Sequence, residues 1–250
     1  MKVAADIMGM PVNVMIADNV DELSQKKDIE NVFSYLRKVD ERFSLYKTNS
    51  EMSRMNRGEV TADAASPELQ EVLALCEQTK RETNGYFDIR INGQLDPSGL
   101  VKGWAIQNAA QLLRKKNYRN FFVEIAGDVQ VLGRNEQGKK WRVGIQNPFQ
   151  SGEIIKVVHL ENCGIATSGN YERGEHIHNP MTHKPATEIA SFTIIGPNVY
   201  EADRFATAAF AMGKSGLEFI ESRPNLEGYM ITKDQRGHWT SGFEKYVENH

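Results

Sequence analysis

The feature that most constrains the fold is a change in hydrophobic period near Phe121. Before it, apolar residues recur at three- and four-residue steps, as in residues 20–43, which predicts an amphipathic helix. After it, short β-branched and aromatic runs such as 121–125 and 129–132 predict strands. No fixed repeat and no long linker divides the chain. We therefore expect an α+β fold, with one domain over 1–250 and two lobes around a cleft.

The remaining elements fit the same mixture. One strand is expected over 4–18, and Ser66 with Pro67 predicts the start of a second helix. Asn84 and Gly85 predict its end, because both residue types tolerate left-handed backbone. Further strands are expected at 141–146, 154–160, 191–195 and 229–232, and further helices at 101–116, 201–212 and 217–221.

Composition excludes several classes of protein. The formal charge is −3, from 30 basic and 33 acidic residues, so the global basic excess typical of a nucleic-acid binder is missing. Cys76 and Cys163 are too few for a disulfide framework, and we expect them to be buried. No stretch is apolar enough to span a membrane. The sequence as given predicts a cytoplasmic protein, although a removed export signal would leave the same sequence.

Two oxygen-bearing side chains, Asp203 and Thr207, lie four residues apart on the predicted helix 201–212. That spacing places them on one face, where a carboxylate and a hydroxyl suit a hard cation such as Mg²⁺. The alternative is an aspartate near the helix N-terminus, favoured by the helix dipole, with a threonine that only packs.

A second cluster, residues 96–103, precedes the predicted helix 101–116. It can present backbone N–H groups and Lys102 to an anion. Gly99 has an unobstructed carbonyl that suits a metal. The alternative is a capped turn in which Asp96 or Ser98 caps the helix and the lysine is solvated.

A third cluster joins small residues at 166–171 to a group of histidines. His176 and His178 lie two residues apart, on one face of an extended segment, and His183 follows closely. A metal ligand, a general base and a simple surface cluster all remain open, although no clear third ligand supports zinc.

Two further turns stand out. Residues 84–88 set aromatic side chains beside a turn, which suits either a planar ligand or a core. Residues 126–128 predict a hairpin turn between two strands. The sequence contains no GxGxxG, Walker A or GxSxG motif, which removes the main support for Rossmann, P-loop and α/β-hydrolase folds.

Together and in this order, the clusters resemble the ApbE family, the FAD:protein FMN transferases, over most of the chain from Met8 to about Met230. The matching motifs are Met8-Gly9-Met10-Pro11, Phe43-Ser44-Leu45-Tyr46, 50–56, 83–88, 96–103, 126–128, 141–146, 166–171, 176–180 and 202–207. A single motif of this kind is weak, whereas the ordered set is specific.

The resemblance implies a function and a fold. Family members bind FAD, cleave its pyrophosphate with Mg²⁺, attach FMN to a Thr or Ser hydroxyl of an acceptor flavoprotein and release AMP. Some members instead hydrolyse FAD to FMN and AMP, and a flavin-binding protein without turnover is a further alternative. The implied fold is one α+β unit with FAD in a cleft between lobes.

The resemblance also implies roles by position. Asp203, Thr207 and the carbonyl of Gly99 match metal ligands, and His176 matches the proposed base for the acceptor hydroxyl. The positions that match flavin contacts are Met8, Tyr46, Tyr86, Phe87, Asp88, Asp96, Lys102 and His178.

Three positions depart from the common family pattern. Ala126 stands where many relatives have glycine, and Asn179 and Gln107 stand where many have an acidic residue. A missing carboxylate at either of the last two positions is expected to alter ion affinity or contacts on the adenine side. None of the three changes removes a proposed metal ligand.

Overall fold

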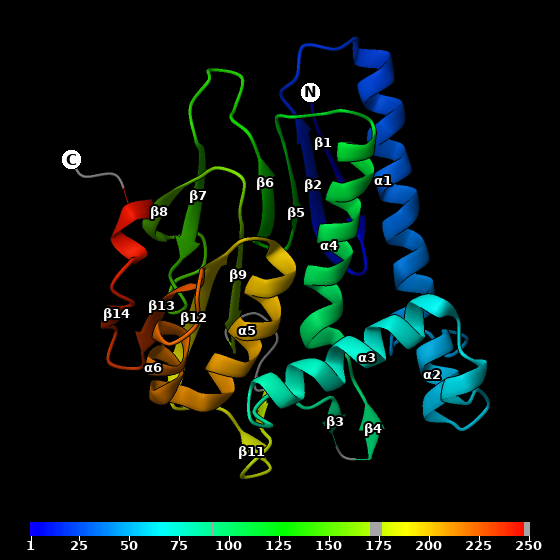
Figure 1. Cartoon of the computed structure of the whole chain (residues 1–250), viewed down its shortest axis with the longest axis vertical. Helices are drawn as coiled ribbons and strands as arrows, with labels where there is room; N and C mark the ends of the chain where they lie inside the picture. Colours follow the sequence, from blue (N-terminus) through cyan, green and yellow to red (C-terminus); the bar gives the residue numbers. More distant parts are fainter. Residues whose placement is uncertain (92, 171–176, 248–250) are drawn as a thin grey trace.

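The computed structural model describes residues 1–91, 93–170 and 177–247, and an eight-stranded sheet runs through it (Figure 1). The strand order is β1-β2-β5-β6-β9-β12-β13-β14, and every neighbouring pair is antiparallel. The strands are β1 (Lys2–Ile7), β2 (Met10–Ile16), β5 (Phe121–Ile125), β6 (Asp128–Leu132), β9 (Gly164–Gly169), β12 (Ile189–Gly196), β13 (Glu227–Thr232) and β14 (Gly237–Trp239). Strands from both ends of the chain thus share one sheet.

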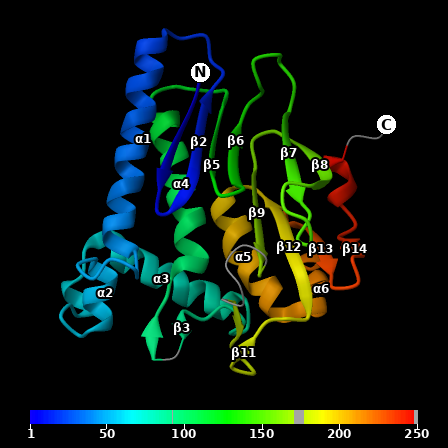
Figure 2. The same cartoon turned by 180° about the vertical axis from the view of Figure 1, so that it is seen from behind.

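The helices cover one face of this sheet (Figures 1 and 2). They are α1 (Glu22–Phe43), α2 (Glu51–Asn56), α3 (Pro67–Glu82), α4 (Ser98–Lys115), α5 (Val199–Met212) and α6 (Gly216–Glu221). Helices α1, α3 and α4 share a core with β1, β2 and β5, whereas α5 and α6 pack on β9, β12 and β13. Short 3-10 turns lie at Ala62–Ala64, Gly213–Ser215 and Phe243–Tyr246.

The opposite face carries a hairpin of β7 (Trp141–Gln146) and β8 (Ile154–Leu160), with a core of its own. Side chains alternate between the two faces, as the period of a strand requires. On β12, Ile194 packs toward the helices and Ile195 toward the hairpin. The expected α+β fold class is confirmed, while the two lobes and the single domain over 1–250 remain predictions.

The helix boundaries follow the local signals in the sequence. Ser66 caps α3 by accepting a hydrogen bond from the Leu69 N–H at 3.3 Å, and Pro67 is its first residue. Asn84 and Gly85 follow α3 with φ of 52° and 85°, the left-handed conformation expected at its end. The predicted strands at 121–125, 141–146 and 154–160 are likewise present.

The predicted single strand over 4–18 is wrong, because the chain reverses at Met8 and Gly9. Both residues have positive φ, 61° and 68°, and Ile7 pairs with Met10 across the turn. Two consecutive left-handed residues form the tight turn whose twist suits a hairpin. Glycine at the second position allows this, but a methionine at the first gives no clear signal in the sequence.

Strand β9 was not predicted, although it contains most of the small-residue cluster at 166–171. It pairs with both β6 and β12, in the interior of the sheet. Its small residues let α5 lie close: a Cβ on Gly164 would be 2.0 Å from the Val199 nitrogen. Close packing explains the glycine at this position. Helix α2 and strand β14 were not predicted, because both are short.

Two minor hairpins complete the described residues. Strands β3 (Arg90–Ile91) and β4 (Gln94–Leu95) pair with each other, as do β10 (His178–Asn179) and β11 (Lys184–Pro185). Within the described parts of the chain, every helix is too short or too polar to cross a bilayer.

Both cysteines are buried free thiols, as expected, and we predict that neither reacts in the folded protein. Cys76 lies in the helix-side core and Cys163 in the hairpin-side core. Burial raises the pKa of the Cys76 thiol to about 12 and that of Cys163 to about 11, so almost no thiolate forms at pH 8. A thiol-disulfide colour reagent should react with two thiols in guanidinium chloride and with almost none in buffer. Fast reaction in buffer would contradict this burial.

Candidate functional site

Helices α4 and α5 meet through glycines. Gly99 and Gly103, one turn apart on α4, face Asp203 and Thr207, one turn apart on α5. A Cβ on Gly103 would lie 2.6 Å from the Cβ of Asp203 and 2.8 Å from the carbonyl oxygen of Val199. A Cβ on Gly99 would lie 3.0 Å from the Cγ2 of Thr207. The absence of both side chains lets the two helices approach this closely.

The contact brings together the three predicted metal ligands. Thr207 Oγ1 donates a hydrogen bond to the Gly99 carbonyl at 3.1 Å. Asp203 is 4% exposed, and its Oδ2 accepts a hydrogen bond from the Gly103 N–H at 2.7 Å. Because Asp203 begins the second turn of α5 and binds α4, a simple capping role does not describe it.

The donor atoms at this contact suit a hard cation. They are a carbonyl, a hydroxyl and a carboxylate oxygen, the ligand types that Mg²⁺ prefers. Ser168 on β9 adds a hydroxyl oxygen 3.4 Å from Thr207 Oγ1. In the described part of the chain, no three His, Cys, Asp or Glu side chains gather in a way that could hold a metal ion. The fit to Mg²⁺ therefore depends on neutral oxygens around a single carboxylate.

A buried ion pair lies beside this contact, on the first turns of α4. Lys102 Nζ is 2.8 Å from Asp128 Oδ2, and Asp128 is only 1% exposed. The other oxygen, Oδ1, accepts a hydrogen bond from the Thr167 N–H at 3.0 Å. Lys102 is 20% exposed in its side chain, so its charge lies at the surface of the site.

Sequence reasoning overlooked this role of Asp128. The hairpin turn at Ala126 and Gly127 is confirmed, with φ of 46° and 85°, but the aspartate after it was given no task. A charged residue that opens an otherwise uncharged strand was the available signal.

The predicted flavin contacts on residues 86–88 and 96–102 lie on adjoining segments. The Asp96 N–H donates to the Ile89 carbonyl at 2.7 Å, which joins the two segments. Phe87 is 3% exposed, and its ring lies beside Gly99, where a Cβ would be 3.4 Å from Cε2. Tyr86 is half-buried between the two helix-side cores.

Two predicted flavin carboxylates already have protein partners. Asp88 Oδ2 is 2.6 Å from Lys80 Nζ, and Asp88 Oδ1 accepts a hydrogen bond from the Arg90 N–H at 2.9 Å. Asp96 Oδ1 accepts from the Ser98 N–H at 2.9 Å, where α4 begins. A turn is therefore present at residues 96–98, but the capped-turn alternative is wrong in its details. Pro97 is the N-cap without a side-chain cap bond, and Lys102 pairs with Asp128 and is not simply solvated.

Met8 lies at the same edge of the sheet as the Ala126 turn. The two turns are neighbours because β2 pairs with β5, and the Ala126 N–H donates to the Pro11 carbonyl at 3.0 Å. His178 lies on the small hairpin that approaches Gly85, where a Cβ would be 2.8 Å from Met181 Cε.

Tyr46 and His176 are not placed in the site. Tyr46 lies between α1 and α2 and is 96% exposed, and its contact with the flavin stays a prediction. His176 falls outside the described residues.

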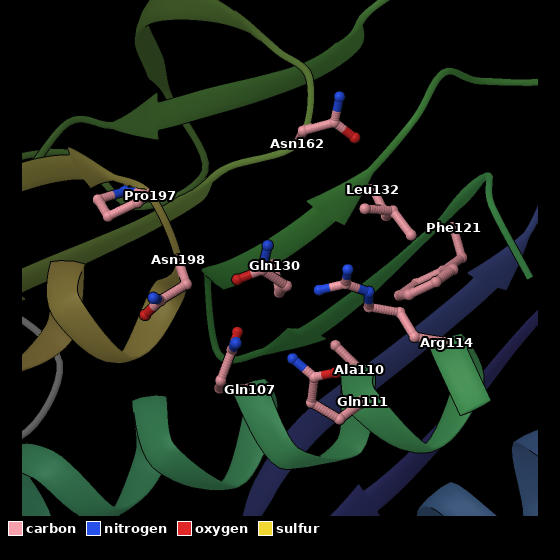
Figure 3. A pocket seen from close by; sticks show the side chains of 10 residues that line it. All are labelled: Gln107, Ala110, Gln111, Arg114, Phe121, Gln130, Leu132, Asn162, Pro197 and Asn198. Atoms are coloured by element: carbon pink, nitrogen blue, oxygen red, sulfur yellow. The ribbon is translucent and has the colours of Figure 1, made fainter. Parts of the chain in front are cut away.

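A separate cavity of about 450 Å³ lies farther along α4 (Figure 3). Gln107, Gln111 and Arg114 point from α4 toward β6, and Asn198 at the start of α5 closes one side. None of the described residues that were predicted for metal or flavin lines this cavity. Gln107, where an altered ion affinity or adenine contact is expected from the sequence, lines this cavity.

Comparison with known proteins gives a consistent result. The model of the ApbE family matches residues 8–94 and 90–230. An FAD:protein FMN transferase of Haemophilus influenzae is 25% identical over a 298-residue alignment that covers 90% of this chain and 85% of that protein. The Escherichia coli K12 protein of the same name is 31% identical over 150 residues, 56% of this chain and 43% of that protein. The latter match thus spans less than half of its relative.

Solved structures share the fold. The ApbE protein of Thermotoga maritima superposes with a TM-score of 0.88 at 20% identity, covering 100% of this chain and 99% of that one. The flavin transferase ApbE of Vibrio cholerae superposes with a TM-score of 0.84 at 22% identity, covering 99% of each chain. Because the family model matches most of its length, this chain belongs to the ApbE family.

Proposed function

We propose that this chain is an FAD:protein FMN transferase that acts with Mg²⁺. A Thr or Ser hydroxyl of an acceptor flavoprotein attacks the FMN phosphorus of FAD. The new bond joins that oxygen to phosphorus, the bond from phosphorus to the bridging oxygen breaks, and AMP leaves with that oxygen. The hydroxyl proton passes to a general base, a role for which His176 is the candidate from the sequence.

The observation that carries this proposal is the convergence of Gly99, Asp203 and Thr207 at the α4–α5 contact. A pyrophosphate repels an incoming oxygen because both carry negative charge. A magnesium ion held by these three oxygens would neutralise part of that charge. The chain itself supplies a rigid frame, since the Gly103 N–H fixes one carboxylate oxygen of Asp203.

The neighbouring groups suit the two halves of the substrate. Lys102, held by Asp128, offers a positive charge beside the phosphates at low entropic cost, because the ion pair orients it. Phe87 and Tyr86 offer ring surface for the isoalloxazine. Phe87 borders Gly99, and Lys102 follows three residues later on α4.

One experiment distinguishes the three functions compatible with these residues. The chain is incubated with FAD, Mg²⁺ and candidate acceptor flavoproteins, and the products are weighed by mass spectrometry. An FMN adduct on an acceptor with release of AMP supports the transferase. Free FMN and AMP without an adduct would indicate an FAD pyrophosphatase, and FAD binding without AMP a non-catalytic flavin protein. An acceptor flavoprotein with a modified Thr or Ser, and a cytoplasmic location, remain predictions.

We predict that the chain binds FAD more tightly than FMN or riboflavin. The candidate contacts extend from Met8 at the sheet edge to His178 on a separate hairpin, a span that suits a dinucleotide. Calorimetric titration with the three ligands measures the order. Equal affinity for riboflavin and FAD would contradict it.

We predict that Asp203→Asn lowers AMP release from FAD by about 100-fold or more, because it removes the only carboxylate assigned to the metal. Asparagine keeps an oxygen that can accept from the Gly103 N–H, so the melting temperature should change little. Thr207→Val should be milder, since water can replace a neutral ligand. Glu201→Gln, which removes a charge elsewhere on α5, is the control. Wild-type rates for Asp203→Asn, with Mg²⁺ dependence intact, would refute the metal assignment.

We predict that Gly103→Ala separates α4 from α5. The new Cβ would overlap the Cβ of Asp203 and the carbonyl of Val199, and neither neighbour is the flexible end of a side chain. Overpacking of this kind costs about 1–3 kcal/mol of unfolding free energy. The loss in the initial rate of AMP release should exceed what the loss of unfolding free energy accounts for. Initial rates and thermal unfolding of the same variant give the two quantities. Lys115→Ala on the exposed last turn of α4 is the control, and equal behaviour of the two variants would argue against the close contact.

A further inference from the structure

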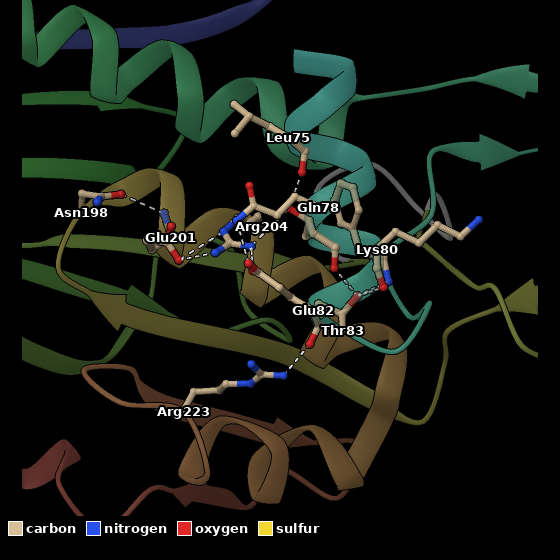
Figure 4. A network of polar contacts seen from close by, with 11 residues as sticks. Leu75, Gln78, Lys80, Glu82, Thr83, Asn198, Glu201, Arg204 and Arg223 are labelled. Atoms are coloured by element: carbon tan, nitrogen blue, oxygen red, sulfur yellow. Dashed lines mark hydrogen bonds and ion pairs between the residues drawn. The ribbon is translucent and has the colours of Figure 1, made fainter. Parts of the chain in front are cut away.

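A buried arginine, Arg204, follows Asp203 on α5 and reaches across to α3 (Figure 4). It is only 5% exposed. Its Nη1 contacts a carboxylate oxygen of Glu82 and donates to Thr79 Oγ1 at 3.3 Å, while Nη2 donates to Glu201 Oε2 at 2.6 Å. A guanidinium buried this deeply is stable only where its N–H groups have partners, and two carboxylates and a hydroxyl provide them.

The two carboxylates differ in what they join. Glu201 is on the same helix as Arg204, three residues earlier, so this pair stays within α5. Glu82 is the last residue of α3, so its bond ties α3 to α5 through two residues that are 122 positions apart in sequence. Burial by itself raises the pKa of Glu82, but hydrogen bonds from Gln78 and Arg204 outweigh it and hold the pKa below its ordinary value. The carboxylate is therefore charged at neutral pH.

A chain of buried hydrogen bonds continues from α3 to the segment that follows it. Thr83 Oγ1 donates to the Thr79 carbonyl at 2.8 Å and accepts from the Phe87 N–H at 3.0 Å. Both threonines are fully buried, so water does not compete for these bonds. The path from Arg204 to Phe87 thus passes through two threonines.

A second arginine holds the same end of α3. Arg223, just after α6, donates from Nη2 to the backbone carbonyl of Glu82. Its guanidinium lies 4.5 Å from the ring centre of Phe219 and 5.7 Å from that of Phe205. The last turn of α3 is thus held through the side chain of Glu82 on one side and through its backbone on the other.

We propose that Arg204 is a positioning residue for the flavin-contacting segment. Through Glu82 and Thr79 it holds residues 83–88 against α5 and so keeps Phe87 in place. This inference rests on the proposed function, because it assumes that this segment contacts the flavin. Arg204 itself makes no contact with substrate in this scheme.

The two carboxylates provide a matched pair of variants. Glu82→Met and Glu201→Met each remove one carboxylate from the same guanidinium, at sites of similar side-chain exposure, 31% and 25%. Only Glu82→Met removes the ion pair between α5 and α3, while the weaker bond from Arg204 to Thr79 remains. It should weaken FAD binding about tenfold, change the absorption spectrum of bound flavin and speed amide exchange at Phe87. Glu201→Met should change each of these less than about twofold.

Thr83→Val tests the path without changing any charge. Valine fills the same volume but lacks the hydroxyl that accepts from the Phe87 N–H. It should repeat the effects of Glu82→Met on exchange and on FAD affinity. Arg204→Met would remove the guanidinium itself, but it is more disruptive. Thr83→Val keeps the test decisive if that variant does not fold.

The readouts are FAD affinity by fluorescence, the flavin spectrum, and amide exchange at Phe87 by NMR. The positioning role would be refuted if Glu82→Met and Glu201→Met had equal effects. It would also be refuted if melting temperature fell while FAD affinity and Phe87 exchange stayed at wild-type values. If the wild-type chain bound no FAD, the proposed function would fail, and exchange at Phe87 would still decide whether Arg204 holds residues 83–88.

Discussion

The close approach of α4 and α5 is the contact on which the rest of the site depends. Two glycines one turn apart face a carboxylate and a hydroxyl one turn apart, so backbone and functional side chains meet without intervening bulk. The hydrogen bond from the Gly103 N–H to Asp203 then holds the carboxylate at one position. A wider helix spacing would leave the Gly99 carbonyl and Thr207 Oγ1 too far apart to share a cation.

Around this contact, charges are buried in pairs. Lys102 meets Asp128 on the sheet side, and Arg204 meets Glu82 on the side of α3. An unpaired charge at such depth would be strongly unfavourable, whereas a hydrogen-bonded pair fixes the geometry of the elements it joins. Each pair joins α4 or α5 to a different element, so the site is held in place from two directions.

Local signals explain how much could be predicted. Periodicity and caps located α1, α3, α4 and most strands, because each signal lies within a few neighbouring residues. The candidate metal ligands were found through their order along the chain, and the structure brings all three together. The roles of Asp128 and Arg204 were missed, since their partners are distant in sequence and no local pattern marks such a pair. Tyr46 lies exposed on a loop, and its flavin contact stays a prediction.

The sequence by itself determined the type of each long element and the residue types able to hold a metal, since both depend on short-range spacing. Tertiary structure alone decided that β9 lies inside the sheet and that Met8 and Gly9 reverse the chain. It also decided which oxygens meet at α4 and α5. The last of these outcomes depends on packing between segments about 100 residues apart, Gly103 and Asp203 among them. Small residues acquire such a role only from the neighbour that packs against them.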